Sequence, residues 1–145
     1  MAKIKECIFK ITSNVINLDD SGLPEGDSEK DEFRVSGFVK SENGTVTLSY
    51  VEKRNGAAVS CDVKVSPEKV EVQRRGDVSC DMIFTVGKTH ESVYKVPPFS
   101  FDMKITALRI DSSIEKEDGS LSLLYLMNIG GAEKRCRMKI AREDN

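Results

Sequence analysis

The sequence predicts an all-β protein, a single antiparallel meander of about eight to ten strands that closes into a β-barrel. Short segments of alternating apolar and polar residues run along nearly the whole chain, which is the pattern of half-buried strands. Gly, Asn-Gly, Asp-Gly or Pro turns separate these segments about every eight to twelve residues. Each segment has one apolar face, whereas strands of a parallel α/β sheet are apolar on both faces.

Ten segments in order follow the strand pattern. Asn-Gly pairs at 43–44 and 55–56 tolerate the positive φ angles of two-residue hairpin turns, and Asp118-Gly119 and Gly130-Gly131 mark later turns. Strands joined by such turns pair antiparallel, and closing the sheet into a barrel removes its exposed edges. The predicted strands cover residues 3–12, 32–40, 45–52, 57–65, 70–75, 79–86, 89–96, 99–110, 121–129 and 132–141.

Two segments depart from the regular pattern. Residues 17–32 contain seven acidic residues against the single Lys30, together with Gly22, Pro24 and Gly26, and predict a flexible acidic loop. In 99–110 the apolar phase shifts, which predicts a bulge near Thr106-Ala107 where the long strand bends.

Size and composition limit the function classes. The 145 residues fit one domain, 1–145, and a net charge of −2 gives no global reason to expect nucleic acid or an anionic membrane as partner. No apolar run is long enough to span a bilayer, and no signal-peptide core follows the first lysines, so we expect a cytoplasmic protein. The four cysteines are widely spaced and read as buried core thiols; we expect no metal site and no cofactor. They are Cys7, Cys61, Cys80 and Cys136.

Several short motifs, in order and spacing, resemble a family of small bacterial proteins of unknown function, the YwiB-like calycin-type β-barrels. The resemblance runs from about Ile4 to Ala141 and implies a lipocalin-like barrel with no established activity and no catalytic residues to transfer. The matching residues are Tyr50-Val51-Glu52, Arg74-Arg75-Gly76, Met82-Ile83-Phe84, Tyr94-Lys95-Val96-Pro97, Thr106, Leu121-Ser122-Leu123-Leu124-Tyr125-Leu126 and Gly130-Gly131.

Side-chain alternation indicates which residues face the barrel interior. With each apolar set placed inward, six polar or aromatic side chains fall in the interior or at its rim. We expect these to form any ligand-binding site: Arg74, Glu52, Tyr50, Tyr94, Tyr125 and His90.

Two interpretations of Arg74 and Glu52 remain open at this stage. The pair forms an internal ion pair that fills a small barrel, or Arg74 anchors the carboxylate or phosphate of a partly apolar ligand. His90 is the only histidine, and no nucleophile or orienting acid accompanies it in a recognised arrangement, so we expect a structural role for it and no enzyme activity.

The last strand adds a second hypothesis. Arg135, Arg137 and Lys139 share the face opposite the apolar residues of that strand and form a basic exterior stripe. A solvated face is the ordinary explanation. The alternative function is an interaction module with a packed interior that contacts protein or RNA through this stripe, although the sequence lacks the interleaved aromatics of a single-strand binder.

Overall fold

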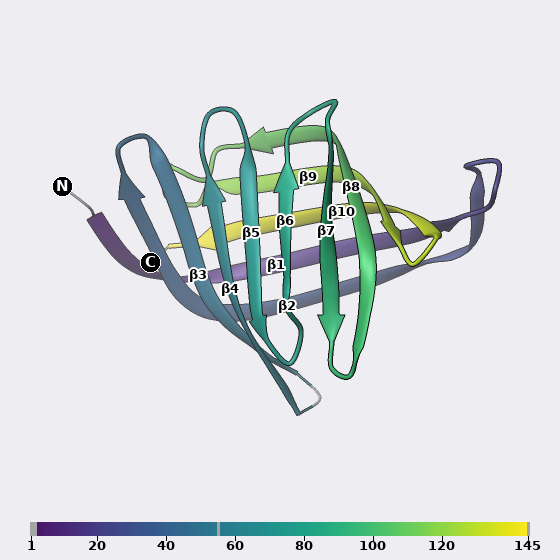
Figure 1. Ribbon diagram of the computed structural model, residues 1–145. Coiled ribbons are helices and arrows are strands. Elements are labelled where there is room, and N and C mark those ends of the chain that lie inside the picture. The colour runs from purple at the N-terminus through teal and green to yellow at the C-terminus, as the bar shows by residue number, and fades with distance from the viewer. Residues whose placement is uncertain (1–2, 55, 145) are drawn as a thin grey trace.

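The computed structural model describes residues 3–54 and 56–144, and these residues form ten β-strands and no helix (Figure 1). Asn55 of the predicted 55–56 turn lies outside the described residues. No helix in the described part has the length and apolar character that a membrane crossing requires. The strands are β1 (Lys3–Leu18), β2 (Pro24–Glu42), β3 (Thr45–Arg54), β4 (Ala57–Val65), β5 (Val70–Gly76), β6 (Cys80–Phe84), β7 (Thr89–Val96), β8 (Phe99–Ser112), β9 (Ser120–Ile129) and β10 (Ala132–Glu143).

The strands form one antiparallel sheet that closes into a nearly complete barrel, which confirms the predicted fold class. Their order is β6-β5-β4-β3-β2-β1-β10-β9-β8-β7, so consecutive strands are neighbours and the pairing of β1 with β10 joins the two halves. The two outermost strands meet where Ser79 and Lys95 exchange backbone hydrogen bonds of 2.9 Å. The finer lipocalin or calycin classification stays a prediction.

Tight turns set this order, as the sequence indicates. Asn43 and Gly44 have φ angles of 51° and 78°, and Gly130 and Gly131 have 58° and 90°. Positive φ at both central positions is the geometry whose twist matches that of antiparallel strands. Each of these turns therefore holds its two strands in register.

The long strand β8 lets the sheet curve back on itself. Its register with β9 shifts between Ala107 and Arg109, close to the predicted bulge, and leaves Leu108 exposed. β8 pairs with β7 only before this point, over residues 99–106, whereas it pairs with β9 on both sides of it, from Met103 to Ser112. In Figure 1, β3 to β7 cross over β1, β9 and β10. The extra residue in a bulge bends its strand, which explains the change of direction.

The core consists of the inward apolar residues of both halves of the sheet. Phe9, Leu48, Phe84 and Ile140 are fully buried. All four cysteines are buried and free, as the sequence predicts. Burial raises the pKa of each thiol, that of Cys136 to about 11, so the cysteines pack as neutral apolar side chains at neutral pH.

The predicted loop at residues 17–32 is wrong for most of its length. β1 continues to Leu18, β2 begins at Pro24, and only a short turn at 19–23 separates them. The Asp19 carboxylate accepts hydrogen bonds from the backbone N–H groups of Ser21 and Leu23 within that turn. The acidic residues of β2 are largely exposed while its backbone pairs with β1, so ladder hydrogen bonds outweigh the repulsion between their charges. Figure 1 shows this hairpin extending beyond the barrel.

One end of the barrel is closed by the segment between β8 and β9. Ile114 in this segment is fully buried in the core, and its carbonyl accepts a 2.8 Å hydrogen bond from Arg142 Nη1. The same guanidinium binds both carboxylate oxygens of Asp144 at 3.0 and 2.8 Å, and Lys5 Nζ lies 2.9 Å from that carboxylate. These contacts connect the start of β1, the end of β10 and the closing segment.

Candidate functional site: the barrel interior

A cavity of about 640 Å³ occupies the end of the barrel opposite the closing segment. The segment 113–119 precedes β9, whereas Gly130 and Ala132, which border the cavity, follow β9. Because both of these residues are exposed, the cavity reaches the surface at the β9–β10 turn. The barrel is therefore packed at one end and hollow at the other.

Five of the six residues expected in the interior line this cavity. They come from four strands, and their inward orientation follows the alternation used to predict it. The five are Tyr50, Glu52, Arg74, Tyr94 and Tyr125.

Arg74 and Glu52 form an ion pair inside the barrel. Arg74 Nη2 donates to Glu52 Oε2 at 3.2 Å, and the two side chains are 24% and 20% exposed. The thiols of Cys61 and Cys80 also border the cavity beside Arg74. A thiol is a weak hydrogen-bond acceptor, so the guanidinium keeps donor capacity that these neighbours do not use fully. Both open interpretations thus start from the same geometry, an ion pair on a cavity wall.

The tyrosines supply aromatic walls. The ring of Tyr125 meets Phe84 edge to face at 4.8 Å, and the ring of Tyr50 lies 5.9 Å from Phe9. Burial raises the pKa of both tyrosines above the ordinary value. Both hydroxyls are neutral at physiological pH, and each has a cysteine thiol as neighbour, Cys61 for Tyr50 and Cys136 for Tyr125.

His90 does not border this cavity, so its expected place in the interior site is corrected. It shares a face with Tyr94 on β7, but it pairs across the strands with the buried Ile105, deeper in the barrel. Its Nε2 lies 3.3 Å from Thr85 Oγ1, beside a separate cavity of about 260 Å³. His90 therefore borders a different cavity from the other five residues, and Met82 borders both cavities.

Two further groups of residues line the cavity. The first group is charged: Glu29 and Asp31, which lie in the segment predicted as a loop, and Lys134. Glu29, Asp31 and Phe33 alternate along β2, so the period-2 signal was present but was masked by the acidic composition. The second group is a set of flexible apolar side chains, Met82, Met103, Met127 and Met138.

The basic stripe on β10 lies outside the barrel, as its alternation predicts. Arg135, Arg137 and Lys139 are exposed, whereas Cys136 and Ile140 are buried. Arg142, farther along β10, does not join the stripe, because it has the inward phase of Cys136 and Ile140 and is 6% exposed at the closed end. Within residues 3–54 and 56–144, no cluster of His, Cys, Asp or Glu is arranged to hold a metal ion.

The fold and the cavity together define the class: a ten-stranded antiparallel β-barrel with a hollow, open interior at one end. The chain belongs to the family described as a domain of unknown function, DUF1934, whose model matches residues 16–140. It is 32% identical over 110 residues to the uncharacterized beta-barrel protein YwiB of Bacillus subtilis (strain 168), covering 76% of this chain and 78% of that protein.

A solved structure gives the same result for the fold. The crystal structure of the ywiB protein from Bacillus subtilis matches with a TM-score of 0.80 and 29% sequence identity. The match covers 98% of this chain and 95% of the solved chain. The family description and the name of the relative state no activity, so a functional proposal has to start from the interior cavity.

Proposed function

We propose that this protein binds a small, partly apolar molecule with an anionic group inside the barrel. The single observation that carries the proposal is the cavity of about 640 Å³ with the Arg74–Glu52 pair on its wall. Ligand pockets have volumes of about 300 to 1,000 Å³ and combine mainly apolar walls with a few polar groups. This cavity has both properties.

Arg74 is the anchor for the anionic group in this proposal. A guanidinium can hold a carboxylate or phosphate through two parallel hydrogen bonds, and Arg74 makes one 3.2 Å bond to Glu52. The methionines and Tyr125 would contact the apolar part of the ligand, because methionine adapts its shape and tyrosine offers both a ring and a hydroxyl.

The cavity also weighs against the alternative function. An interaction module with a fully packed interior would have no space for a ligand, and the barrel holds space of ligand size at its open end.

Native mass spectrometry of freshly purified protein tests the proposal by detecting a small molecule that copurifies with the chain. We expect Arg74→Ala to lose that molecule while the barrel stays folded by circular dichroism. The matched control is Arg75→Ala, because Arg75 is the next residue, is 54% exposed and pairs with Asp81 at 2.7 Å. Equal retention by the Arg74→Ala variant would contradict the proposed anchor.

Glu52→Gln separates the two interpretations of the ion pair. If Glu52 competes with the ligand for Arg74, removing its charge frees the guanidinium and increases retention of the molecule. If the pair only stabilises the barrel, Glu52→Gln lowers the unfolding midpoint in urea and does not increase retention. That second result, together with unfolding of Arg74→Ala, would replace ligand binding with a structural role.

A further inference from the structure

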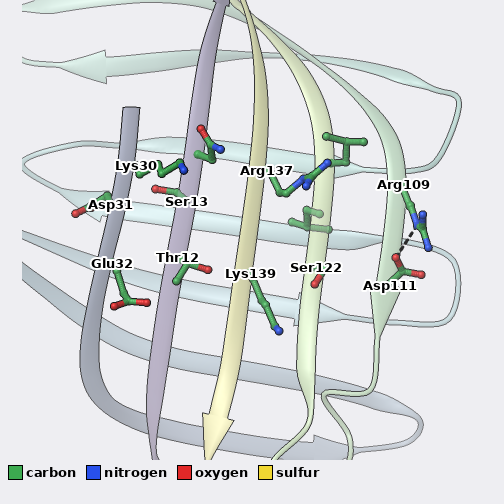
Figure 2. A pocket seen from close by; sticks show the side chains of 13 residues that line it. Thr12, Ser13, Lys30, Asp31, Glu32, Arg109, Asp111, Ser122, Arg137 and Lys139 are labelled. Carbon is green, nitrogen blue, oxygen red and sulfur yellow. Dashed lines mark hydrogen bonds and ion pairs between the residues drawn. The ribbon is translucent and has the colours of Figure 1, made fainter. Parts of the chain in front are cut away.

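We propose a second binding site, for the phosphate group of a small phosphate monoester, on the outer face of the barrel. An open groove of about 720 Å³ lies there, across five neighbouring strands in the order β2, β1, β10, β9 and β8 (Figure 2). Ser13 and Asp31 border both this groove and the interior cavity. The side chains that carry the proposal have the opposite alternation phase and point away from the core.

The strand registers place the groove side chains in two rows across the sheet. Neighbouring strands lie about 5 Å apart and residues two apart on one strand about 7 Å, so side chains within the rows and between them can reach a common ligand. One row is Lys30, Asn14, Arg137, Leu124 and Arg109; the next is Glu32, Thr12, Lys139, Ser122 and Asp111.

The acidic members of the second row are already engaged. Glu32 lies 3.2 Å from Lys10 Nζ, and Asp111 lies 2.7 Å from Arg109 Nε. Figure 2 shows the Arg109–Asp111 contact at one side of the groove. Among the described residues, no ion pair includes Arg137, Lys139 or Lys30. The centre of the groove therefore has positive charge that the protein does not neutralise.

Uncharged donors surround the two central cations. Thr12 and Ser122 lie on the two strands that flank Lys139, opposite it in register, and Figure 2 shows their hydroxyl groups on either side of that lysine. Asn14 lies opposite Arg137 in register, and its side-chain Nδ2 group is a third uncharged donor. Its Oδ1, which is buried without a hydrogen-bond partner in the described structure, is an acceptor and does not contribute to binding an anion.

This donor set favours phosphate over the other common anionic groups. A guanidinium, an ammonium, two hydroxyls and an amide offer more donors than the two oxygens of a carboxylate use, and the three free oxygens of a phosphate monoester can accept them. Single-stranded nucleic acid fits less well, because its bases stack on aromatic rings and none of the residues that line the groove is aromatic.

A heteronuclear NMR titration with inorganic phosphate, at constant ionic strength, tests the site. We expect saturable shifts centred on the amides of Asn14, Thr12 and Arg137, with sodium acetate giving weaker binding. Arg137→Ala and Lys139→Ala should each weaken phosphate binding roughly tenfold, as expected for the loss of a charge-assisted hydrogen bond.

Arg135→Ala is the matched control. Arg135 is exposed on the same face of β10, two residues before Arg137, but it does not border the groove. Its substitution should change phosphate affinity less than twofold, and Arg74→Ala in the interior should leave it unchanged. A negative result for ligand binding in the interior would therefore not contradict the phosphate site. A negative result for phosphate binding would likewise not contradict the interior site.

Three results would overturn the proposal. Shifts that do not saturate and spread over the exposed lysines would show unspecific ion attraction. An equal loss of affinity in Arg135→Ala would show that the general charge of β10, and not the groove, attracts phosphate. Tighter binding of a single-stranded oligonucleotide without terminal phosphates, with a steep salt dependence, would identify a nucleic-acid surface instead.

Discussion

The two ends of the barrel each contain an arginine paired with an acid, in different surroundings. At the closed end Arg142 binds Asp144 through two hydrogen bonds and the Ile114 carbonyl through a third, and its side chain is 5% exposed. At the open end Arg74 makes one 3.2 Å bond to Glu52 on a cavity wall. The arginine–carboxylate pair thus stabilises the closed end of the barrel, whereas at the open end the arginine keeps hydrogen-bond donors that a ligand can use.

This difference distinguishes a buried ion pair that stabilises the fold from one that can also bind a ligand. A buried arginine whose donors are taken by protein acceptors has little left to offer a ligand, and its loss leaves an unpaired carboxylate in the core. An arginine with an incomplete set of acceptors beside a cavity is the better candidate for recognition. Four measurements can test this distinction.

The largest loss of stability is expected from a substitution at the closed end of the barrel. Arg142→Met leaves the Ile114 carbonyl without its partner and removes two of the hydrogen bonds to the Asp144 carboxylate, which keeps Lys5, so the free energy of unfolding should fall by about 3 kcal/mol. Equilibrium unfolding in urea measures this loss. The control Arg34→Ala removes an exposed pair with Glu143 and should cost less than about 1 kcal/mol. Equal losses would show that Arg142 has no special structural role.

A pH effect follows from the same cluster. Burial alone would raise the pKa of the Asp144 carboxyl, but hydrogen bonds from Arg142 and Lys5 outweigh it and hold the pKa at about 2. Because this folded-state pKa lies below the unfolded value near 4, the stabilisation is complete above about pH 4 and is lost as the pH falls through 2.

The stability contributed by Asp144 should therefore be about 2 kcal/mol at neutral pH. Urea unfolding of the natural chain and of Asp144→Asn, compared between pH 6 and pH 2, measures it. The gap between the two proteins should be widest above pH 4 and shrink as the pH approaches 2. A constant gap over this range would mean that the carboxyl has an ordinary pKa.

A smaller loss of stability is expected at the open end. Arg74 and Glu52 keep about a fifth of their side-chain surface exposed, so water can solvate Glu52 when its partner is removed. Arg74→Met should cost about 1 kcal/mol in urea unfolding, well below the cost of Arg142→Met. A loss as large as that at the closed end would remove the contrast between the two arginines.

The last measurement changes no residue. Cys61 and Cys80 border the cavity, whereas Cys7 and Cys136 do not. Burial raises the pKa of all four thiols, so each should react slowly with iodoacetamide at pH 7.5. Peptide mapping by mass spectrometry should find Cys61 and Cys80 modified first, because a small reagent can enter the cavity. Uniform modification would indicate that the whole barrel opens.

The strand alternation was sufficient to predict most of the interior site. In a regular strand the direction of every second side chain is a local property, so Tyr50 and Arg74 could be placed inward without knowledge of the pairing. His90 obeyed the same alternation but lies too deep in the barrel, because alternation gives a direction and not a position along the barrel axis.

Features that depend on register between distant strands could not be predicted. The groove row from Lys30 to Arg109 combines five strands whose alignment is set by turns and bulges along the whole chain. Arg142 has the inward phase of Cys136 and Ile140 on β10, but its hydrogen bond to the Ile114 carbonyl depends on how segment 113–119 folds over the barrel end. The composition of residues 17–32 was read correctly as solvated, but solvation did not prevent pairing with β1.

The outer half of β2 has one further consequence. β3 pairs with β2 only over residues 37–42, so among the described residues the segment 24–36 has β1 on one side and an open edge on the other. Such an edge can template strand addition by a second molecule and start aggregation. The carboxylates of Glu25, Asp27 and Glu29 along it act as like-charge gatekeepers, so replacing them with threonine should lower the solubility of the protein without changing its fold.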